Sequence, residues 1–411
     1  MRIGLIAGEY PPMQGGLGDY TREIAREFAR AGHEPHVITL SMAGALPLET
    51  SEGVTVHRVM PAWNWQTGGR LAAFQHTHSL DVFNLQYQAA AYQMHPAINL
   101  LPGWLNKRAP TVVTFHDLKV PYLFPKAGPL RRRAVLGMAR NAAAAVVTNR
   151  EDYDDLERER IANVHLIPIG SNIAPADLTG FDVNAWRRER AIPKALTLIG
   201  YFGFMNESKG GETLVRALAE LRALAELRAL AELRALAELR ALAELRGRGL
   251  NVGVLQIGGQ TGASDPTNMA YAAHLKQLAQ QLGVAPFIFE TGFVDAHGVS
   301  TAFAACECVA LPYRDGVSFR RGTLMAALVH GKAIVTTTPR IDLPEVRDAV
   351  NMLLVPADDP VALADAISRA LSDRALRGQL EAGALQLSRQ FGWGEIASEL
   401  VKVFEEAAGG W

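Results

Sequence analysis

The chain has 411 residues, of which 49% are apolar and 20% are charged, and its net charge is −1. This length is enough for two or three domains with sizeable cores, and the balanced charge excludes a general attraction to nucleic acid. No apolar run reaches the ~18 residues that a membrane-spanning helix needs. The two cysteines, Cys306 and Cys308, are interpreted as buried structural thiols, with a reducing cytoplasm as the default location.

The first half of the chain alternates apolar strands with helices. Residues 2–7 are predicted to form a strand rather than a signal peptide, and residues 20–31 an amphipathic helix. The loop between them contains Gly15, Gly16 and Gly18, which lack the G-x-G-x-x-G order of dinucleotide-binding turns. We interpret Gly15 and Gly16 as positions where the backbone comes close to a ligand. Further strands are expected at residues 36–40, 54–56, 83–88, 111–117, 143–148 and 164–170.

Two polar features of this half have more than one interpretation. His116 and Asp117 end the strand at 111–117, and this position alone leaves a ligand site and a place in the core both open. Three arginines at 131–133 begin a helix that reaches Asn141. They would face either an anionic membrane surface or plain solvent.

A second α/β region begins after residues 171–194, whose proline, glycine and charge indicate a linker. A strand is expected at 196–203, and the loop after it leads into a helix. Lys209 lies one turn before that helix. A lysine there is well placed to bind a phosphate, although lysines near helix starts are also common on protein surfaces.

The helix after Lys209 contains a perfect tandem repeat. The six residues ALAELR occur five times from Ala217 to Arg246, and Gly247 ends the run. Its leucines recur every third residue and wind around the helix, so no fixed coiled-coil seam forms. A continuous helix over 211–246 would be roughly 54 Å long at 1.5 Å per residue. We interpret the repeat as an expansion of one original copy, with extra turns that project into solvent or self-associate.

The stretch 315–331 lies between two apolar, strand-like runs. A turn at the carboxyl end of a strand, followed by a helix, is where open α/β sheets bind ligands. Asp315, Arg320 and Arg321 would suit a ligand with both phosphate and hydroxyl groups, while an ordinary turn with a solvated basic face is the alternative. The other elements of this half are expected at residues 252–259, 268–282, 287–292, 306–311, 351–356, 359–371, 375–391 and 393–408.

Together these elements predict an α/β protein with two Rossmann-like lobes and a cleft between the carboxyl ends of their strands. The first lobe would span residues 1–185. The second lobe would span residues 186–392 and include the repeat helix at 217–246. Residues 393–411 would form a C-terminal helix that returns to the first lobe.

Six short segments resemble the family 4 retaining glycosyltransferases, which have the two-Rossmann-lobe (GT-B) fold. The segments are GGLGD at 15–19, TFH at 114–116, IPIGSN at 167–172, YFGFMNESKG at 201–210, LPYRDG at 311–316 and FGW at 391–393. The resemblance implies transfer of a sugar from a nucleotide-diphosphate sugar to a glycan or lipid-linked acceptor, with retention and with no cofactor or metal. The first lobe would bind the acceptor and the second the nucleotide sugar. Glycan assembly in the cytoplasm, or at the inner face of the membrane, is the general expectation.

The resemblance also implies roles for individual residues. Gly15 and Gly16 would pack against the donor diphosphate, and Lys209 would hold it. His116 would stand by the reacting centre, and Asp315 matches the first acid of the family's Glu–seven residues–Glu motif, which contacts hydroxyls of the donor sugar. His116 and Asp315 are therefore the expected catalytic residues. The other expected donor contacts are Gly316, Val317, Ser318, Arg320, Arg321 and Thr323, and the expected acceptor contacts are Asp19, Tyr87 and His95.

Two positions depart from the family pattern. The second Glu of the motif, which holds the ribose, falls on Thr323, and the arginine before the loop lysine falls on Phe204. Arg320 or Arg321 could replace the lost charge. The departures leave two other functions open, namely a non-catalytic homologue that binds nucleotide sugar or glycan, and a nucleotide-sugar epimerase. A nicotinamide oxidoreductase is excluded because neither lobe begins with the spaced glycine fingerprint.

Overall fold

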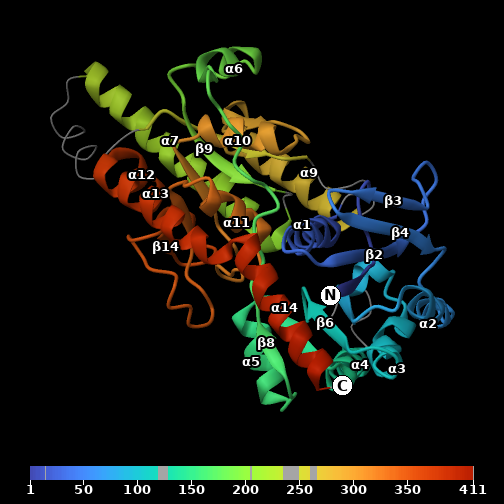
Figure 1. Cartoon of the computed structure of the whole chain (residues 1–411). Helices are drawn as coiled ribbons and strands as arrows, with labels where there is room; N and C mark the ends of the chain where they lie inside the picture. Colours follow the sequence, from blue (N-terminus) through green and yellow to red (C-terminus); the bar gives the residue numbers. More distant parts are fainter. Residues whose placement is uncertain (14, 119–127, 204–205, 235–249, 260–265, 411) are drawn as a thin grey trace. The chain divides into compact units, whose positions relative to one another are not determined.

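The computed structural model describes residues 1–13, 15–118, 128–203, 206–234, 250–259 and 266–410 (Figure 1). The chain divides into two compact lobes, which are the N-terminal lobe (Met1–Asn172 with Phe391–Trp411) and the C-terminal lobe (Ile173–Gln390). Each lobe is built on a sheet of mainly parallel strands, which confirms the predicted α/β class. The division falls inside the segment at 171–194 that the sequence indicates as a linker.

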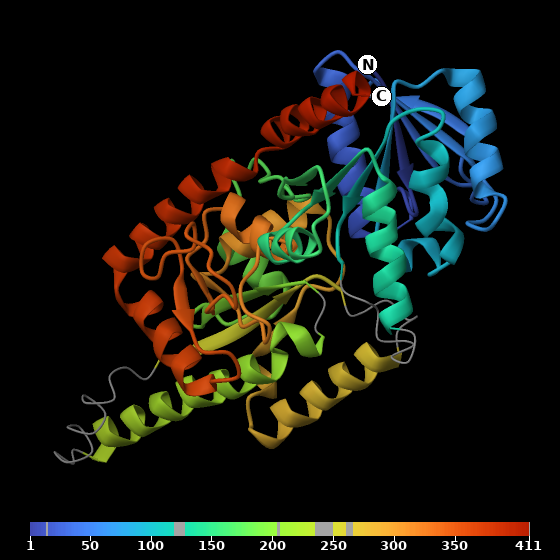
Figure 2. The same cartoon turned by 90° about the horizontal axis from the view of Figure 1, so that it is seen from below.

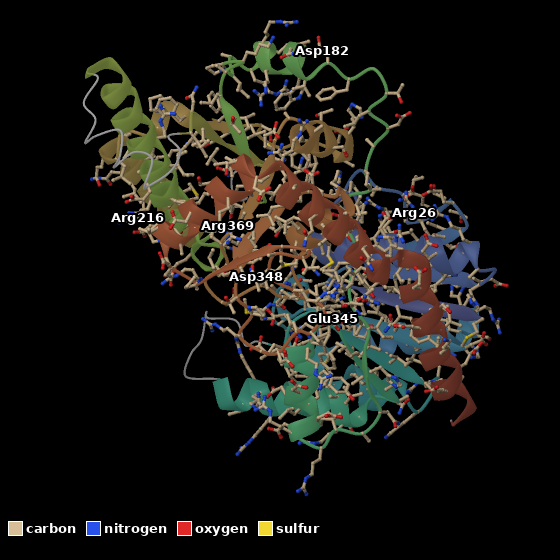
Figure 3. The ribbon with its side chains drawn as sticks, turned by 90° about the vertical axis from the view of Figure 1, so that its left-hand side faces the viewer. Arg26, Asp182, Arg216, Glu345, Asp348 and Arg369 are labelled. Carbon is tan, nitrogen blue, oxygen red and sulfur yellow. The ribbon has the colours of Figure 1, made fainter. Side chains whose placement is uncertain are left out.

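Part of this predicted linker is helix α6 (Val183–Glu189), which begins at a side-chain cap (Figure 3). Asp182 Oδ1 accepts hydrogen bonds from the N–H groups of Asn184 and Ala185, at 2.8 and 3.1 Å. Arg187 then donates to the carbonyl oxygens of Leu196 and Ala305, both at 2.9 Å. The linker prediction is therefore wrong for α6, because tertiary contacts that composition does not reveal tie this helix to the C-terminal lobe.

The N-terminal lobe contains an eight-stranded sheet in the order β3-β4-β2-β1-β5-β6-β7-β8, parallel throughout except for the β3–β4 pair. Its strands are β1 (Arg2–Ala7), β2 (Glu34–Leu40), β3 (Leu48–Ser51), β4 (Val54–Met60), β5 (Val82–Tyr87), β6 (Thr111–Phe115), β7 (Ala144–Val147) and β8 (Val164–Leu166). Its α-helices are α1 (Gly16–Arg30), α2 (Thr67–His78), α3 (Leu101–Leu105), α4 (Gly128–Asn141), α5 (Arg150–Arg158) and α14 (Trp393–Gly409). Strand β3 escapes prediction because all four of its residues are exposed, so it has no apolar side.

Helices α1 and α14 pack together in the N-terminal lobe. The buried face of α1 includes Leu17, Tyr20 and Phe28, and the ring of Phe28 lies 5.7 Å from that of Phe404 on α14. Helix α1 begins at Gly16, four residues before the predicted start. The prediction is wrong here because Leu17 belongs to the same apolar face as Tyr20 and takes part in the core.

The C-terminal lobe contains a six-stranded parallel sheet in the order β11-β10-β9-β12-β13-β14. Its strands are β9 (Thr197–Phe202), β10 (Val252–Ile257), β11 (Ile288–Glu290), β12 (Cys308–Leu311), β13 (Ile334–Thr337) and β14 (Leu353–Val355). Its α-helices besides α6 are α7 (Gly211–Arg234), α9 (Pro266–Gln281), α10 (Ala296–Ala304), α11 (Gly322–Val329), α12 (Pro360–Ser372) and α13 (Arg374–Ser388). Cys306 and Cys308 are buried free thiols, as predicted, and burial raises the pKa of each to about 12.

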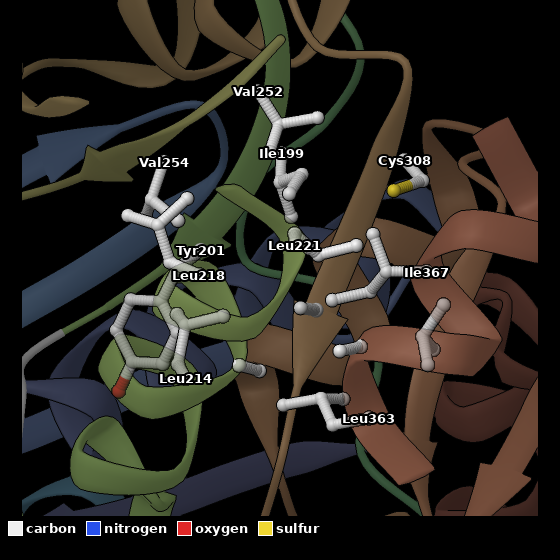
Figure 4. Close-up of a cluster of buried hydrophobic side chains, with 14 of the residues drawn as sticks. Ile199, Tyr201, Leu214, Leu218, Leu221, Val252, Val254, Cys308, Leu363 and Ile367 are labelled. Carbon is white, nitrogen blue, oxygen red and sulfur yellow. The ribbon is translucent and has the colours of Figure 1, made fainter. Parts of the chain in front are cut away.

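A core of this lobe lies between the sheet and the helices α7 and α12 (Figure 4). The labelled side chains are Leu214, Leu218 and Leu221 of α7, Leu363 and Ile367 of α12, and Ile199, Tyr201, Val252, Val254 and Cys308 of the sheet. Full burial of one such aliphatic side chain stabilises the fold by about 1.5–3 kcal/mol. The first ALAELR copy, which holds Leu218 and Leu221, is therefore part of the core.

Helix α7 contains the first three ALAELR copies and ends at Arg234, so the predicted repeat helix is confirmed up to that residue. The copies at 235–246 lie outside the described residues. Arg216, before the first copy, is exposed and bonds Glu212 one turn away at 2.8 Å (Figure 3). Figure 2 shows the far end of α7 extending beyond the helices that flank it. The described buried contacts of the repeat fall in its first copy.

We therefore expect the fold to survive deletion of four repeat copies, residues 223–246. The variant should lose helical signal in circular dichroism but unfold cooperatively within about 3 °C of the parent, because surface changes away from a core alter stability little. Leu218→Ala in the retained first copy is the control, and it should cost about 2–5 kcal/mol. A deletion variant that fails to unfold cooperatively would contradict this interpretation of the repeat.

Candidate active site

Two segments of the C-terminal lobe meet where the strand order of its sheet reverses. Strand β9 lies between β10 and β12, and the segments after β9 and β12 leave the same carboxyl edge. They are joined by a hydrogen bond from the Arg314 N–H to the Ser208 carbonyl, at 2.9 Å. Gly210 is left-handed (φ +70°), and a Cβ there would lie 1.8 Å from the Pro312 carbonyl oxygen. Only glycine permits this approach of the two backbones.

Asp315 binds two guanidinium groups at this edge. Arg320 Nη2 lies 2.6 Å from Asp315 Oδ2, and Arg321 Nη2 bonds Asp315 Oδ1. Both arginine side chains are 13% exposed and Asp315 is 17% exposed. Burial raises the pKa of Asp315, but Arg321 and Arg320 outweigh this effect and hold the pKa below its usual value. Asp315 is thus ionised and forms an ion pair with each of the two arginines.

Lys209 brings a further positive charge from the segment after β9. A Cβ on Gly203 would lie 3.1 Å from Lys209 Nζ and 2.6 Å from Thr323 Cγ2, so both side chains close in on this glycine. Burial, and then the charge of Arg321, lowers the pKa of Lys209 to about 8. Within the described parts of the chain, Lys209 Nζ has no hydrogen-bond or ion-pair partner. Lys209 therefore adds a positive charge with which no described residue pairs, and we call Lys209, Asp315, Arg320 and Arg321 the cationic cluster.

Tyr313 contacts both Arg321 of the cationic cluster and Thr323. Its ring carries the Arg321 guanidinium at 4.7 Å from the ring centroid, and its hydroxyl lies 2.7 Å from Thr323 Oγ1. Arg321 Nε is buried and has no hydrogen-bond partner among the described residues. At position 323, where the family has a carboxylate, this chain therefore has the Thr323 hydroxyl, which is paired with the Tyr313 hydroxyl. The other departure, Phe204, lies outside the described residues.

The three residues after Asp315 shape the turn. Gly316 is left-handed (φ +79°), and a Cβ there would lie 2.7 Å from the Thr338 carbonyl oxygen. Val317 is buried, and its N–H donates to the Thr337 carbonyl oxygen at 3.2 Å. Ser318 accepts the Arg321 N–H through its carbonyl oxygen, also at 3.2 Å. Val317 therefore offers a ligand neither its N–H nor its side chain, and it positions the arginines instead.

In the N-terminal lobe, Glu9 occupies the amino end of helix α1. Its Oε1 accepts the Leu17 N–H at 3.2 Å, and a Cβ on Gly15 would lie 1.9 Å from the same oxygen. Burial raises the pKa of Glu9, partly offset by the N–H groups of Gly18 and Leu17. Gly15 is thus needed to admit the Glu9 carboxylate, whereas Gly16 has open space around it. Sequence analysis misses Glu9, because no spacing rule links it to the helix that it caps.

His116 is the last residue in a chain of hydrogen bonds that begins at Asn84. The bond from Asn84 to a backbone carbonyl fixes which atoms donate and which accept along the chain. Asn84 Nδ2 donates to the Val112 carbonyl, at 3.3 Å, so Asn84 Oδ1 must be the acceptor that Gln86 Nε2 bonds. Gln86 Oε1 is then the acceptor that lies 2.9 Å from His116 Nε2. A neutral His116 consequently carries its proton on Nε2 and leaves Nδ1 as an acceptor. Asn84 and Gln86 are fully buried. The sequence indicates Gln86 as a plausible acceptor contact, because it lies on the first lobe, but it does not single out Asn84.

An aromatic column ties His116 to the last helix. The Tyr20 ring lies 4.6 Å from the His116 ring and 5.3 Å from that of Trp393. Trp393 Nε1 donates to the Ser171 carbonyl at 2.8 Å, and a Cβ on Gly170 would lie 2.6 Å from the Trp393 ring. The family segments around Gly170 and Trp393 therefore meet each other, and through Tyr20 they hold the His116 ring in place.

The three predicted acceptor contacts have different surroundings in the structure. Tyr87 is buried in the core, and its hydroxyl accepts a bond from Asn99 at 3.0 Å. Asp19 pairs with Arg22 on α1, at 3.3 Å. His95 caps a short helical turn, where its Nδ1 accepts the Ala97 N–H at 3.2 Å. Asp19 and His95 are only partly buried, whereas Tyr87 is enclosed and supports its neighbours.

The basic start of helix α4 is partly neutralised within the lobe. Arg132 donates to both carboxylate oxygens of Asp155, at 2.9 and 3.1 Å, and to Glu159 at 3.1 Å. These bonds favour the interpretation of a solvated, ion-paired helix over a membrane-facing basic cluster. Among the described residues, none of the helices is long and apolar enough to cross a bilayer.

Both lobes match known protein families. The model of the family described as "Glycosyl transferase 4-like domain" matches residues 15–170, and that described as "Glycosyl transferases group 1" matches residues 234–373. The chain belongs to the group 1 glycosyltransferases of GT-B fold. This glycosyltransferase is 27% identical to the D-inositol 3-phosphate glycosyltransferase of Xylanimonas cellulosilytica, over 96% of this chain and 92% of the relative. It is 26% identical to that of Corynebacterium diphtheriae, over 99% and 95%.

Solved structures share the fold of this glycosyltransferase at lower identity. Sucrose-phosphate synthase from Thermosynechococcus elongatus has a TM-score of 0.73 and 18% identity, with 100% of both chains covered. The Anabaena protein HepE, in complex with UDP and glucose, has a TM-score of 0.71 and 17% identity, with 98% of this chain and 99% of HepE covered. These matches confirm the predicted GT-B architecture of two lobes.

The direction of the hydrogen-bond chain can be tested with Gln86→Met. Methionine keeps the length of the side chain but removes its acceptor, so a buried His116 N–H is left unpaired and the free energy of unfolding should fall by about 1–3 kcal/mol. Nitrogen chemical shifts of the His116 ring should show an Nε2-protonated tautomer in the parent and a mixture in the variant. Gln88→Met, two residues away, is the control, with an expected change within about 0.5 kcal/mol. An Nδ1-protonated ring in the parent would overturn the assignment.

His116 should also make stability depend on pH. Burial lowers its pKa from 6.5 to about 4. Between these values the unfolded chain binds a proton that the folded chain does not, so the free energy of unfolding should fall as pH drops from 6.5 towards 4. His116→Gln should flatten this dependence in melting experiments. The exposed His76, changed to Gln, should leave it as in the parent, and an unchanged slope in His116→Gln would exclude His116 as the source.

Proposed function

We propose that this glycosyltransferase moves a hexose from a nucleoside-diphosphate sugar to an acceptor hydroxyl, with retention at the anomeric carbon. The cationic cluster carries the proposal. Lys209 is largely buried and its ammonium has no ion-pair partner among the described residues, and Arg321 Nε is buried and without a hydrogen-bond partner there. Buried charge without a counter-ion is unfavourable, and a bound diphosphate would supply the missing negative charge.

The proposed chemistry uses the cluster twice. In binding, Lys209 and Arg321 hold the diphosphate, and in reaction the same groups stabilise the charge that develops on it as its bond to the sugar breaks. Asp315 accepts hydrogen bonds from the sugar hydroxyls and so fixes the position of the sugar. The acceptor oxygen then bonds to the anomeric carbon as the bond from this carbon to the diphosphate breaks, and its proton passes to the diphosphate oxygen that leaves. His116 Nδ1 offers an acceptor to a substrate hydroxyl bound by the N-terminal lobe.

The relatives suggest which substrates to try first. UDP and glucose are bound to HepE, and inositol 3-phosphate appears in the names of the curated relatives. We propose a uridine nucleotide sugar as the first donor to test and an inositol phosphate as the first acceptor. A glycan or lipid-linked acceptor is the next to test. We propose that the reaction takes place in the cytoplasm or at the inner face of the membrane. No cofactor or metal forms part of the proposal.

The donor can be identified by thermal stability against UDP, GDP, ADP and dTDP sugars. A ligand at about 100 times its dissociation constant stabilises by roughly 2.7 kcal/mol, which is several degrees in melting temperature. We expect a shift with one nucleotide, and about 10- to 100-fold weaker binding in Lys209→Ala and Arg321→Ala, since a bond to a charged group contributes about 1.5–3 kcal/mol. Binding should weaken above pH 8, because the pKa of Lys209 is about 8 and only the protonated amine pairs with the diphosphate.

Arg314→Ala is the matched control for these variants. Arg314 precedes Asp315, but its guanidinium bonds Glu207 at 2.6 Å and Asp358 at 2.9 Å, away from the cluster. The Arg314→Ala variant should keep its donor affinity within about twofold of that of the parent, since exposed ion pairs contribute little. Donor binding without sugar transfer to any acceptor would favour the non-catalytic homologue, which the Thr323 and Phe204 departures motivate. A changed donor sugar in the absence of acceptor would favour the epimerase, and the anomeric configuration of the product tests retention.

A further inference from the structure

We infer that His36, His57 and His78 form a binding site for a divalent transition metal, which we assign to zinc. One ring nitrogen from each histidine lies within 4.8 Å of those from the other two. The closest pair, His36 Nδ1 and His57 Nε2, is 3.0 Å apart. Ligand nitrogens around a tetrahedral zinc are about 3.4 Å apart, because each Zn–N bond is about 2.1 Å. We call these residues the histidine triad.

Three separate elements bring the histidine triad together. His36 lies on β2 and His57 on β4, and the parallel register pairs His36 with Thr55, so both histidines point to the same face of the sheet. His78 is the last residue of α2. Its ring centroid lies 4.9 Å from that of His57 and 5.5 Å from that of His36. A hydrogen bond between His36 and His57 accounts for that pair, but it does not explain why a third imidazole converges on them.

The surroundings suit neutral imidazole ligands. Phe74 stacks on the His78 ring at 4.0 Å and meets the His57 ring edge-on at 4.8 Å, which holds both rings in place. Arg2 also acts on His36, but its guanidinium is paired with Asp81 at 4.0 Å.

The histidine triad lies away from the transfer site. His78 accepts a bond from Arg2 through its carbonyl oxygen, at 3.2 Å, and Arg2 begins β1 at the amino edge of the sheet. His116 follows the carboxyl end of β6, at the opposite edge. Since His36 and His78 are only partly buried, a water molecule can fill the fourth position of the metal. A zinc ion here would link β2, β4 and α2 and would stabilise the lobe without taking part in sugar transfer.

The test uses the full chain without an affinity tag, stripped with EDTA and then incubated with zinc chloride. Elemental analysis should find about one zinc ion per chain, and zinc at about 100 times its dissociation constant should raise the melting temperature by about 5–10 °C. His36→Gln and His78→Gln should lose both effects. His76→Gln, an exposed histidine two residues from His78, should keep them, and stripping should leave transferase activity unchanged.

Three outcomes would overturn the assignment. The first is a stripped parent that takes up no zinc and shows no shift, which would leave the histidine triad as a hydrogen-bonded part of the core. The second is zinc uptake that survives both His36→Gln and His78→Gln. The third is loss of the shift in His76→Gln as well, which would indicate unspecific binding at the surface. His36 and His78 are chosen because they are less buried than His57, so their variants should still fold.

Discussion

The balance of charge in the C-terminal lobe is the constraint on which the proposed site depends. A buried cation loses its hydration, and it is tolerated only where an anion or a ring of hydrogen bonds replaces the lost water. Asp315 satisfies part of this need for Arg320 and Arg321, and the Tyr313 ring satisfies another part for Arg321. Lys209 meets the need by shifting its pKa downwards. Lys209 thus remains a positive charge without a counter-ion among the described residues, at the edge where parallel sheets bind ligands.

The N-terminal lobe is organised by the direction of hydrogen bonds rather than by net charge. A backbone carbonyl, that of Val112, can only accept, and this fact sets the orientation of Asn84, then of Gln86, and finally of the His116 ring. One carboxylate of this lobe, that of Glu9, is already engaged with the amino end of α1. The described parts of the two lobes thus differ in kind, since the C-terminal lobe offers the Lys209 ammonium and the N-terminal lobe a neutral, oriented acceptor.

Much of the fold could be predicted from the sequence, because buried parallel strands are continuous apolar runs such as residues 2–7 and 144–147. The positions of Lys209, Asp315, Arg320 and Arg321 could also be predicted, since each follows a strand within a short, polar segment. Glu9 and Asn84 could not, because no local spacing links Glu9 to the helix that it caps, and Asn84 acts through Val112 and Gln86 inside the core. The exposed strand β3 was missed because its residues have no apolar side that a local pattern can detect.

The repeat in α7 makes the length of one helix adjustable in fixed steps. Each copy of six residues adds about 9 Å and turns the helix by about 240°, so three copies add about 27 Å and return to the starting direction. Because the copies are identical, a gain or loss of copies leaves the residues that flank the repeat in the sequence unchanged. The buried contacts described for the repeat belong to its first copy. Within the described helix, which holds three copies, the number of copies therefore sets how far α7 extends beyond the core that anchors it.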